Sequence, residues 1–317
     1  MKPAAGLSIL VAAILVSLAL LSPSRALADE LPADTTQIES LTPEQAKTLL
    51  AEFTGRSNVL QLNGLTALDA DTAKVLAEFN GEWLVLDGLT TLDADTAKAL
   101  AEFKGFLNLN GLPTLNAATA KVLAEFKGEQ LLLNGLTALD AATAKALAEF
   151  KGQYLCLNGL TTLDAATAKA LAEFKGQQLD LDGLTTLNVA TAKALAGSTA
   201  WKGNGQLPNL TTLDADTAKA LAESKSWDGQ LPNITAFESP DSVEIATALA
   251  KRKGPLLLRS LTKISPKTLT ALIEKEDVEI PLIETLELIQ EPDGSPTDDF
   301  MIPKGFQSRQ KARQQGR

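Results

Sequence analysis

The chain has 317 residues, with 29 Lys and Arg against 39 Asp and Glu, one cysteine and no histidine. This acidic balance disfavours nucleic acid as a partner, because acidic side chains repel the phosphate backbone. The lack of histidine excludes Ser-His-Asp and Cys-His nucleophile pairs and His-ligated zinc, so we expect no enzyme activity, no cofactor and no metal site.

Residues 1–28 have the composition of a secretory signal peptide. Lys2 supplies a positive start, an apolar run extends from Leu7 to Leu21, and Ala26-Leu27-Ala28 is a small-x-small cleavage site. The run is shorter than the roughly 20 residues that span a bilayer, and a retained membrane anchor is the alternative. We expect a mature chain without a membrane span, exported by a bacterium to its periplasm, cell envelope or surroundings.

A short acidic lead-in at residues 29–38 is followed by a repeated segment of about 24 residues that covers residues 39–287. The residue before the third apolar position marks each copy and is found at Ser40, Gly64, Gly88, Gly111, Gly135, Gly159, Gly183, Asn209, Asn233 and Ser260. Successive markers are separated by 24, 24, 23, 24, 24, 24, 26, 24 and 27 residues. Such a period predicts an array of about ten stacked units. The units become irregular after Ala196.

The unit Leu155–Gly176 shows the two elements of each copy. Apolar and polar residues alternate in Leu155-Cys156-Leu157-Asn158, as in a half-buried strand, whereas Ala168 and Leu171 follow the helical period. A single unit buries too little apolar surface to offset its backbone entropy, so the units must stack with parallel strands and a shared leucine core. The sequence therefore predicts an α/β solenoid.

The run Leu-x-Leu-x-Gly-Leu-x-x-Leu, followed by a short helix ending in Leu-Ala, resembles a leucine-rich repeat of the ribonuclease-inhibitor-like and cysteine-containing kinds. The motif is most specific in the five copies between Leu60 and Gly176. Leucines replace the Asn or Cys common in related repeats at Leu65, Leu89, Leu112, Leu136, Leu160 and Leu184. The resemblance implies a horseshoe or arc with parallel strands on the concave face, short helices on the convex face, and ligands usually held on the concave face.

The irregular units contain prolines at the strand positions, in Gln206-Leu207-Pro208-Asn209 and Gln230-Leu231-Pro232-Asn233. Proline cannot donate to a strand ladder, so we expect these strands to be short or offset. Trp201 and Trp227 precede them and are interpreted as covers for a thinner core, with ligand binding as the alternative.

The array is expected to close with two further helices, a strand between them and a terminal piece. The helices are expected at Glu244–Arg252 and Lys267–Glu274, the strand at Leu256–Leu258 and the terminal piece at Leu282–Ile289. Residues 288–317 are predicted to be a disordered tail. Its last 14 residues hold five basic and no acidic side chains, which suits a solubilising tail or contact with an anionic surface.

Three columns of strand side chains are expected to point away from the core. The first is Val59, Trp83, Phe106, Gln130, Tyr154, Gln178; the second is Gln61, Val85, Asn108, Leu132, Cys156, Asp180; the third is Asn63, Asp87, Asn110, Asn134, Asn158, Asp182. Exposed aromatic and aliphatic side chains suit a binding site. The predicted binding residues are Trp83, Val85, Phe106, Asn108, Leu132, Tyr154, Cys156 and Asp180, although these side chains could instead merely cover the strand edge.

Two polar series have structural interpretations. The Asn and Asp of the third column suit a hydrogen-bonded ladder, with calcium or sugar binding as the alternative. A second series is expected to cap the helices, and consists of Asp69, Asp93, Asn116, Asp140, Asp164, Asn188 and Asp214.

These patterns favour a non-catalytic, exported protein that binds a protein or peptide through its strand face. The alternative is a structural component of the cell envelope that assembles end to end, because its units are nearly uniform and one cysteine cannot form an intramolecular disulfide that would seal an end. The oligomeric state stays open.

Overall fold

A computed structural model describes residues 31–53, 57–201, 207–295, 302–303, 305–308 and 310. The predicted signal peptide at residues 1–28, the insertion Gly203-Asn204-Gly205 and most of the basic C-terminal segment lie outside the described residues. The residues from Asp34 onward form one compact unit. Among the described residues, no helix combines the length and the apolar character needed to cross a bilayer.

The lead-in ends in a short capping element. The 3-10 helix η1 (Thr35–Gln37) precedes helix α1 (Pro43–Phe53), and no strand is assigned between them. Thr42 Oγ1 accepts from Gln45 N at 3.2 Å, while Gln45 Oε1 accepts from Thr42 N at 2.9 Å, which forms a reciprocal cap. The prediction that the first unit has a helix without a preceding strand is confirmed.

Six short strands form one parallel sheet in chain order, and helices alternate with them along the chain. The strands are β1 (Val59–Gln61), β2 (Trp83–Val85), β3 (Phe106–Asn108), β4 (Gln130–Leu132), β5 (Tyr154–Cys156) and β6 (Gln178–Asp180). The helices are α2 (Ala70–Leu76), α3 (Ala94–Leu100), α4 (Ala117–Leu123), α5 (Ala141–Ala148), α6 (Ala165–Leu171), α7 (Val189–Ala196) and α8 (Ala215–Glu223).

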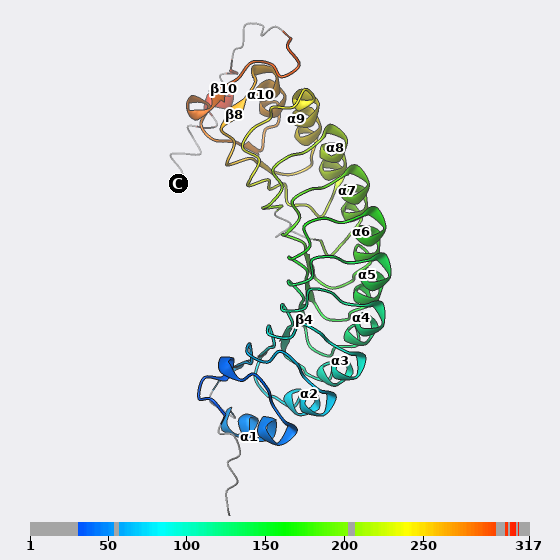
Figure 1. Ribbon diagram of the computed structural model, residues 1–317. Coiled ribbons are helices and arrows are strands. Elements are labelled where there is room, and N and C mark those ends of the chain that lie inside the picture. Colours follow the sequence, from blue (N-terminus) through cyan, green and yellow to red (C-terminus); the bar gives the residue numbers. More distant parts are fainter. Residues whose placement is uncertain are drawn as a thin grey trace, which may run out of the picture. The chain divides into compact units, whose positions relative to one another are not determined.

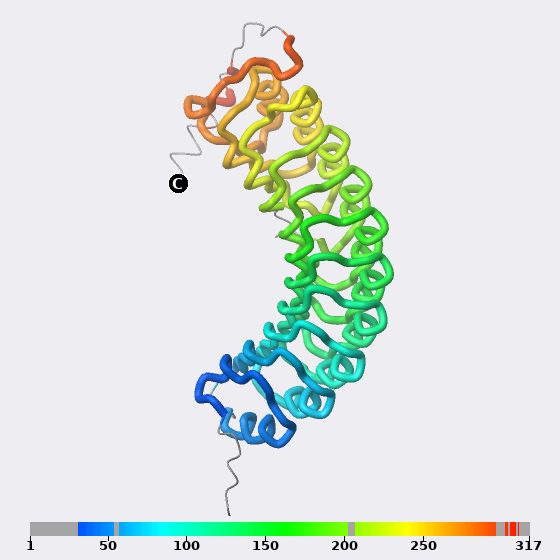
Figure 2. Tube along the Cα trace, viewed as in Figure 1, coloured from blue at the N-terminus to red at the C-terminus, as the bar shows by residue number. Residues whose placement is uncertain are grey.

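The helices of the stacked repeats lie in one row and the strands in another (Figures 1 and 2). Within these repeats the strands follow the inner side of the curve and the helices the outer side. The predicted α/β solenoid, with its parallel strands on the concave side and short helices on the convex side, is confirmed.

The core between the two rows is built from the same positions in every repeat. In the unit around β5, Leu155, Leu157, Leu160 and Leu171 have no exposed surface. The phenylalanines that follow helices α4, α5 and α6 add a ring stack, and centroids of successive rings lie 5.9 and 6.1 Å apart from Phe126 through Phe150 to Phe174. Each repeat is thus buried by its neighbours, as a solenoid requires.

Every predicted N-cap is present at the start of its helix. The side chains of Asp69, Asp93, Asn116, Asp140, Asp164, Asn188 and Asp214 each accept from a threonine amide in the first turn. Hydrogen bonds to Thr96 and Thr167 lower the pKa of Asp93 and Asp164, with the backbone amide as the largest cause. Because such a bond favours the charged carboxylate, Asp93 and Asp164 are ionised at neutral pH.

The capped threonines also connect neighbouring repeats. Thr191 is 1 % exposed, and its hydroxyl donates to Leu163 O at 3.0 Å, 28 residues earlier. Thr167 makes the equivalent bond to Leu139 O at 3.3 Å. The backbone amide of each of these two threonines therefore donates to the cap of its own helix, while the hydroxyl donates to the preceding repeat.

The irregular units keep the helix row but shorten the strands. Gln230 forms only an isolated parallel bridge, to Leu257, as expected for a proline-containing strand. Trp201 and Trp227 are each 1 % exposed. The interpretation that these tryptophans cover the core of the irregular units is confirmed.

The array ends in two small parallel sheets beside the last helices. Strand β7 (Leu256–Leu257) pairs with β9 (Val278–Glu279), and β8 (Lys263–Ile264) pairs with β10 (Glu287–Leu288). Helices α9 (Ser242–Ala250) and α10 (Pro266–Ile273) correspond to the two predicted helices, and η2 (Ile283–Thr285) with β10 forms the closing piece.

The described part of residues 288–310 packs against the array. Glu291 is 5 % exposed, and its Oε1 accepts from Lys267 N at 2.9 Å. Phe306 is 3 % exposed, and Gln310 Nε2 donates to Pro281 O at 2.9 Å. The prediction of a disordered tail from residue 288 is wrong for these residues, because their contacts bury polar and aromatic groups that composition alone assigned to solvent.

Candidate binding surface on the strand side

The outward side chains of β1 to β6 stand in register, as the sequence predicts. Val59, Trp83, Phe106, Gln130, Tyr154 and Gln178 pair in order along the first column, and Gln61, Val85, Asn108, Leu132, Cys156 and Asp180 along the second. We call this surface, together with the residue directly before each strand, the strand face.

The aromatic residues of the first column are half-buried rather than fully exposed. The rings of Trp83 and Phe106 meet edge to face, with centroids 4.8 Å apart and planes at 63°. Leu132 and Tyr154, on the next two strands, are also half-buried. Trp83 and Phe106 therefore cover part of each other, and all four apolar side chains still present some surface to solvent.

The second column is more enclosed than expected. Val85 is 7 % exposed and Cys156 is 5 % exposed, whereas Asn108 and Asp180 are half-buried. The expectation that this column points into solvent is wrong at Val85 and Cys156, and at Cys156 the side chains of Gln130 and Asp180 on the two adjacent strands hydrogen-bond the thiol. Val85 and Cys156 thus support the surface from below.

The cysteine is held as a thiol. Cys156 Sγ donates to Asp180 Oδ2 at 3.3 Å and accepts from Gln130 Nε2 at 3.8 Å. Burial, followed by the charge of Asp180, raises the pKa of Cys156 to about 12. A thiol that stays protonated at neutral pH is a poor nucleophile and a poor metal ligand.

The third column forms the predicted ladder. Each Oδ1 accepts from the backbone amide of the next repeat at 2.9 Å, from Asp87 to Asn110, Asn134, Asn158 and finally Asp182. The Oδ1 atoms of Asp87, Asn110, Asn134 and Asn158 are thus committed to the backbone, so the structural interpretation is confirmed at these four positions. Among the described residues, no group of three or more Cys, Asp or Glu is placed to hold a metal ion.

The ladder ends in a cluster of carboxylates. Burial, followed by the charges of Asp180 and Asp228, raises the pKa of Asp182 to about 6. Gln178 Nε2 donates to Asp180 Oδ1 at 2.7 Å and so supports one of the charged neighbours. Negative charge is therefore concentrated beside β6.

All charged side chains in the strand segments are acidic. The segments between the glycines that flank each strand, residues 57–64, 81–88, 105–111, 128–135, 152–159 and 176–183, contain Glu82, Asp87, Glu129, Asp180 and Asp182 but no Lys or Arg. Lysines recur instead on the helices and directly after them, as at the exposed Lys98 and Lys104. The strand face is therefore negative, and the basic residues lie toward the helices.

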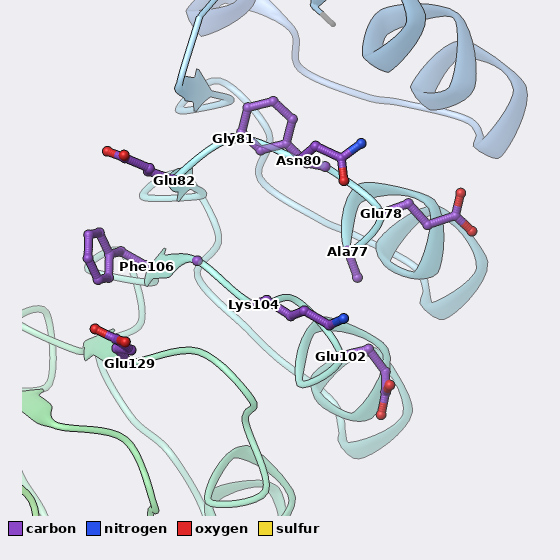
Figure 3. A pocket seen from close by; sticks show the side chains of 11 residues that line it. Ala77, Glu78, Asn80, Gly81, Glu82, Glu102, Lys104, Phe106 and Glu129 are labelled. Atoms are coloured by element: carbon purple, nitrogen blue, oxygen red, sulfur yellow. The ribbon is translucent and has the colours of Figure 1, made fainter. Parts of the chain in front are cut away.

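A hollow of about 770 Å³ lies where the chain passes from α2 and α3 into β2 and β3. Figure 3 shows Glu82, Phe106 and Glu129 following one another on its strand side, while Glu78, Glu102 and Lys104 lie on its helix side. Glu82 and Glu129 are exposed, and the hollow has four glutamates against one lysine in its lining. The hollow thus adjoins the aromatic pair and shares the negative charge of the strand face.

Of the predicted binding residues, Trp83, Phe106, Leu132 and Tyr154 form one partly open surface, with Asn108 and Asp180 beside them. Sequence reasoning missed Glu82 and Glu129, because the predicted columns started at the first residue of each strand and left out the residue directly before it. The position before each strand reads Asn58, Glu82, Gly105, Glu129, Gln153 and Gln177 in the six rungs, and this series could have revealed them.

A scan against protein-family models and a search of curated proteins found no match.

Proposed function

We propose that this chain is an exported, non-catalytic binding protein of the leucine-rich-repeat kind that recognises a protein or peptide with its strand face. The observation that carries the proposal is the partly open apolar surface of Trp83, Phe106, Leu132 and Tyr154 on the side of the sheet away from the helices. Rigid aromatic side chains with partly buried bodies are typical anchors of protein interfaces.

The repeats support this function by what varies among them. The helix segment TAKALAEFKG is nearly unchanged from copy to copy, whereas the first two strand columns differ in every rung. A constant scaffold with a varied face fits recognition of an irregular partner. Export rests on residues 1–28, and the absence of catalysis rests on a chain without histidine and with an enclosed, protonated thiol.

The test is selection of a randomised, displayed peptide library on the full chain, followed by binding assays with two variants. Trp83→Ala combined with Tyr154→Ala should weaken the selected peptides by about tenfold or more, since interface anchors carry most of the binding energy. Lys98→Ala combined with Lys145→Ala changes exposed helix residues and should leave binding unchanged. Peptides that bind the aromatic variant as tightly as the wild type would refute the proposal.

A direct readout is available because Trp83 is half-buried, whereas Trp201 and Trp227 are each 1 % exposed. Quenching of tryptophan fluorescence by acrylamide should come mainly from Trp83, and a bound peptide should suppress it. Suppression that persists in the Trp83→Ala variant would place the peptide elsewhere.

End-to-end assembly is the second candidate. Leu288, on the terminal strand β10, is 48 % exposed and is the one large apolar side chain in the described residues with such exposure. A strand edge that carries an exposed leucine favours contact with another molecule. A monomeric mass in light scattering at high protein concentration would remove this candidate.

A further inference from the structure

We propose that the strand face selects a cationic polypeptide, and that a lysine or arginine side chain of this partner occupies a notch formed by Glu82, Gly105, Phe106 and Glu129. This inference rests on the proposed function and adds the chemical class of the partner. It is carried by the register of three strands, the aromatic pair and the distribution of charge over the face.

The register places the two glutamates on either side of a residue without a side chain. Glu82, Gly105 and Glu129 directly precede β2, β3 and β4, whose first residues pair in order. Phe106 N donates to Glu82 O at 2.6 Å, which fixes the spacing between the first two rungs. Because strands lie about 4.8 Å apart, the two glutamates are separated by roughly 10 Å at the backbone, and Gly105 lies between them in the lining of the hollow.

The ring of Phe106 lies beside Gly105 in the lining of the hollow. The Phe106 side chain projects to the same side as Glu82 and Glu129, and follows Glu82 in Figure 3. Trp83 packs against the Phe106 ring at 4.8 Å and limits its movement. A cation within about 6 Å of a ring centroid is attracted to the ring face, and the stem of a lysine or arginine adds apolar contact.

The two glutamates are available for a partner. Glu102, on the helix side of the hollow, is already paired with Lys127 at 2.5 Å. Within the described part of the chain, neither Glu82 nor Glu129 forms an ion pair with Lys or Arg. No basic side chain in the described ranges therefore compensates their charges, and the strand segments themselves contain no Lys or Arg.

The geometry favours an organic cation over a metal ion. Calcium takes six to eight oxygen ligands, and the part of the chain that the structure describes brings together no group of three or more Cys, Asp or Glu side chains that could hold a metal ion. An ammonium or guanidinium group on a flexible stem can lie between the two glutamates. The apolar residues Leu132 and Tyr154 continue from the notch along the sheet, so the partner is expected to combine basic and apolar side chains.

The library selection described above tests this inference separately from the proposed function. Peptides whose binding depends on Trp83 and Tyr154 should be enriched in Lys or Arg. Glu82→Gln combined with Glu129→Gln should weaken them by about tenfold at low ionic strength, and the difference from the wild type should shrink as salt is added. The same peptides with glutamine in place of every basic residue should bind more weakly to the wild type.

Glu149→Gln combined with Glu173→Gln is the matched control, because it removes two exposed carboxylates near the helix ends and changes the net charge equally. Peptides that need Trp83 and Tyr154 but show neither basic enrichment nor sensitivity to the Glu82 and Glu129 changes would overturn the inference and leave the proposed function intact. An equal loss of binding in the control would mean unspecific attraction, which also overturns the notch.

The chain's own basic segment is a competing occupant. Residues 304–317 contain five basic side chains and no acidic one. If a synthetic peptide of these residues binds at Glu82 and Glu129 more tightly than every selected sequence, the occupant is a segment of this chain, and a separate partner is refuted. If it binds more weakly than the selected peptides, the separate partner is supported.

Discussion

Gly135 lies where the backbones of two repeats approach closely, and replacing it with alanine tests the stacking directly. A Cβ atom there would lie 2.8 Å from Asn110 C, 2.9 Å from Leu112 O and closer still to Asn110 O. Ordinary contacts begin near 3.4 Å, so the two repeats must separate by at least 3.4 − 2.8 Å, or about 0.6 Å.

That separation affects two interactions at once. It stretches the ladder bond from Asn134 N to Asn110 Oδ1, now 2.9 Å, and it loosens the fully buried Leu109 and Leu133. Overpacking costs about 1–3 kcal/mol and a weakened hydrogen bond about 0.5–1.5 kcal/mol. We therefore expect Gly135→Ala to lower the free energy of unfolding by about 2–4 kcal/mol.

Urea denaturation followed by circular dichroism measures this loss, and Gly197→Ala is the control. At Gly197 the nearest atom to a Cβ is Ala194 O at 3.4 Å, and φ is −82°, so alanine fits. Because alanine lowers the conformational entropy of the unfolded chain, this variant should be about 0.4–1 kcal/mol more stable than the wild type. Equal midpoints for the two variants would refute the argument from close approach.

Three further predictions concern single side chains. Cys156 should resist a thiol reagent at pH 8 in the folded chain, because its pKa is raised to about 12, and rapid labelling without denaturant would contradict this. Wild-type stability should fall as the pH rises from about 4 to 6, because the folded state holds the Asp182 proton up to a pKa of about 6 while the unfolded chain releases it near 3.8. Asp182→Asn should flatten this dependence and raise the free energy of unfolding by about 1 kcal/mol at pH 7, a value kept low because the carboxyl is only partly buried. An unchanged pH profile of thermal unfolding in this variant would be evidence against the prediction. Asn116→Ala should cost about 1 kcal/mol through loss of the cap on Thr119 N, whereas Asn116→Asp should not, and equal melting of both variants would contradict the cap.

The sequence predicted those features that depend on period and on local hydrogen bonding. The leucines at 155, 157 and 160 gave the strand register and the core, and the capping residues could be placed because a carboxylate or amide before a helix serves its own first turn. These features repeat in every unit, so one correct unit describes the array.

Features that depend on neighbouring units were missed. The burial of Cys156 comes from side chains on adjacent strands, and the hydroxyl bond of Thr191 reaches a carbonyl 28 residues away. The notch of Glu82 and Glu129 depends on a glycine in the rung between them. Spacing within one unit carries no information about such lateral contacts, and composition misled the prediction for Glu291 and Phe306 in the same way.

The bond to the preceding repeat, which is donated by the hydroxyls of Thr72, Thr96, Thr167 and Thr191, has a consequence for the length of the array. Because donor and acceptor recur once in each 24-residue period, excision of one whole period, such as residues 136–159, would join a donor to an equivalent acceptor. The shortened chain would keep the same seams between modules, so the number of modules can change without redesign of any of them.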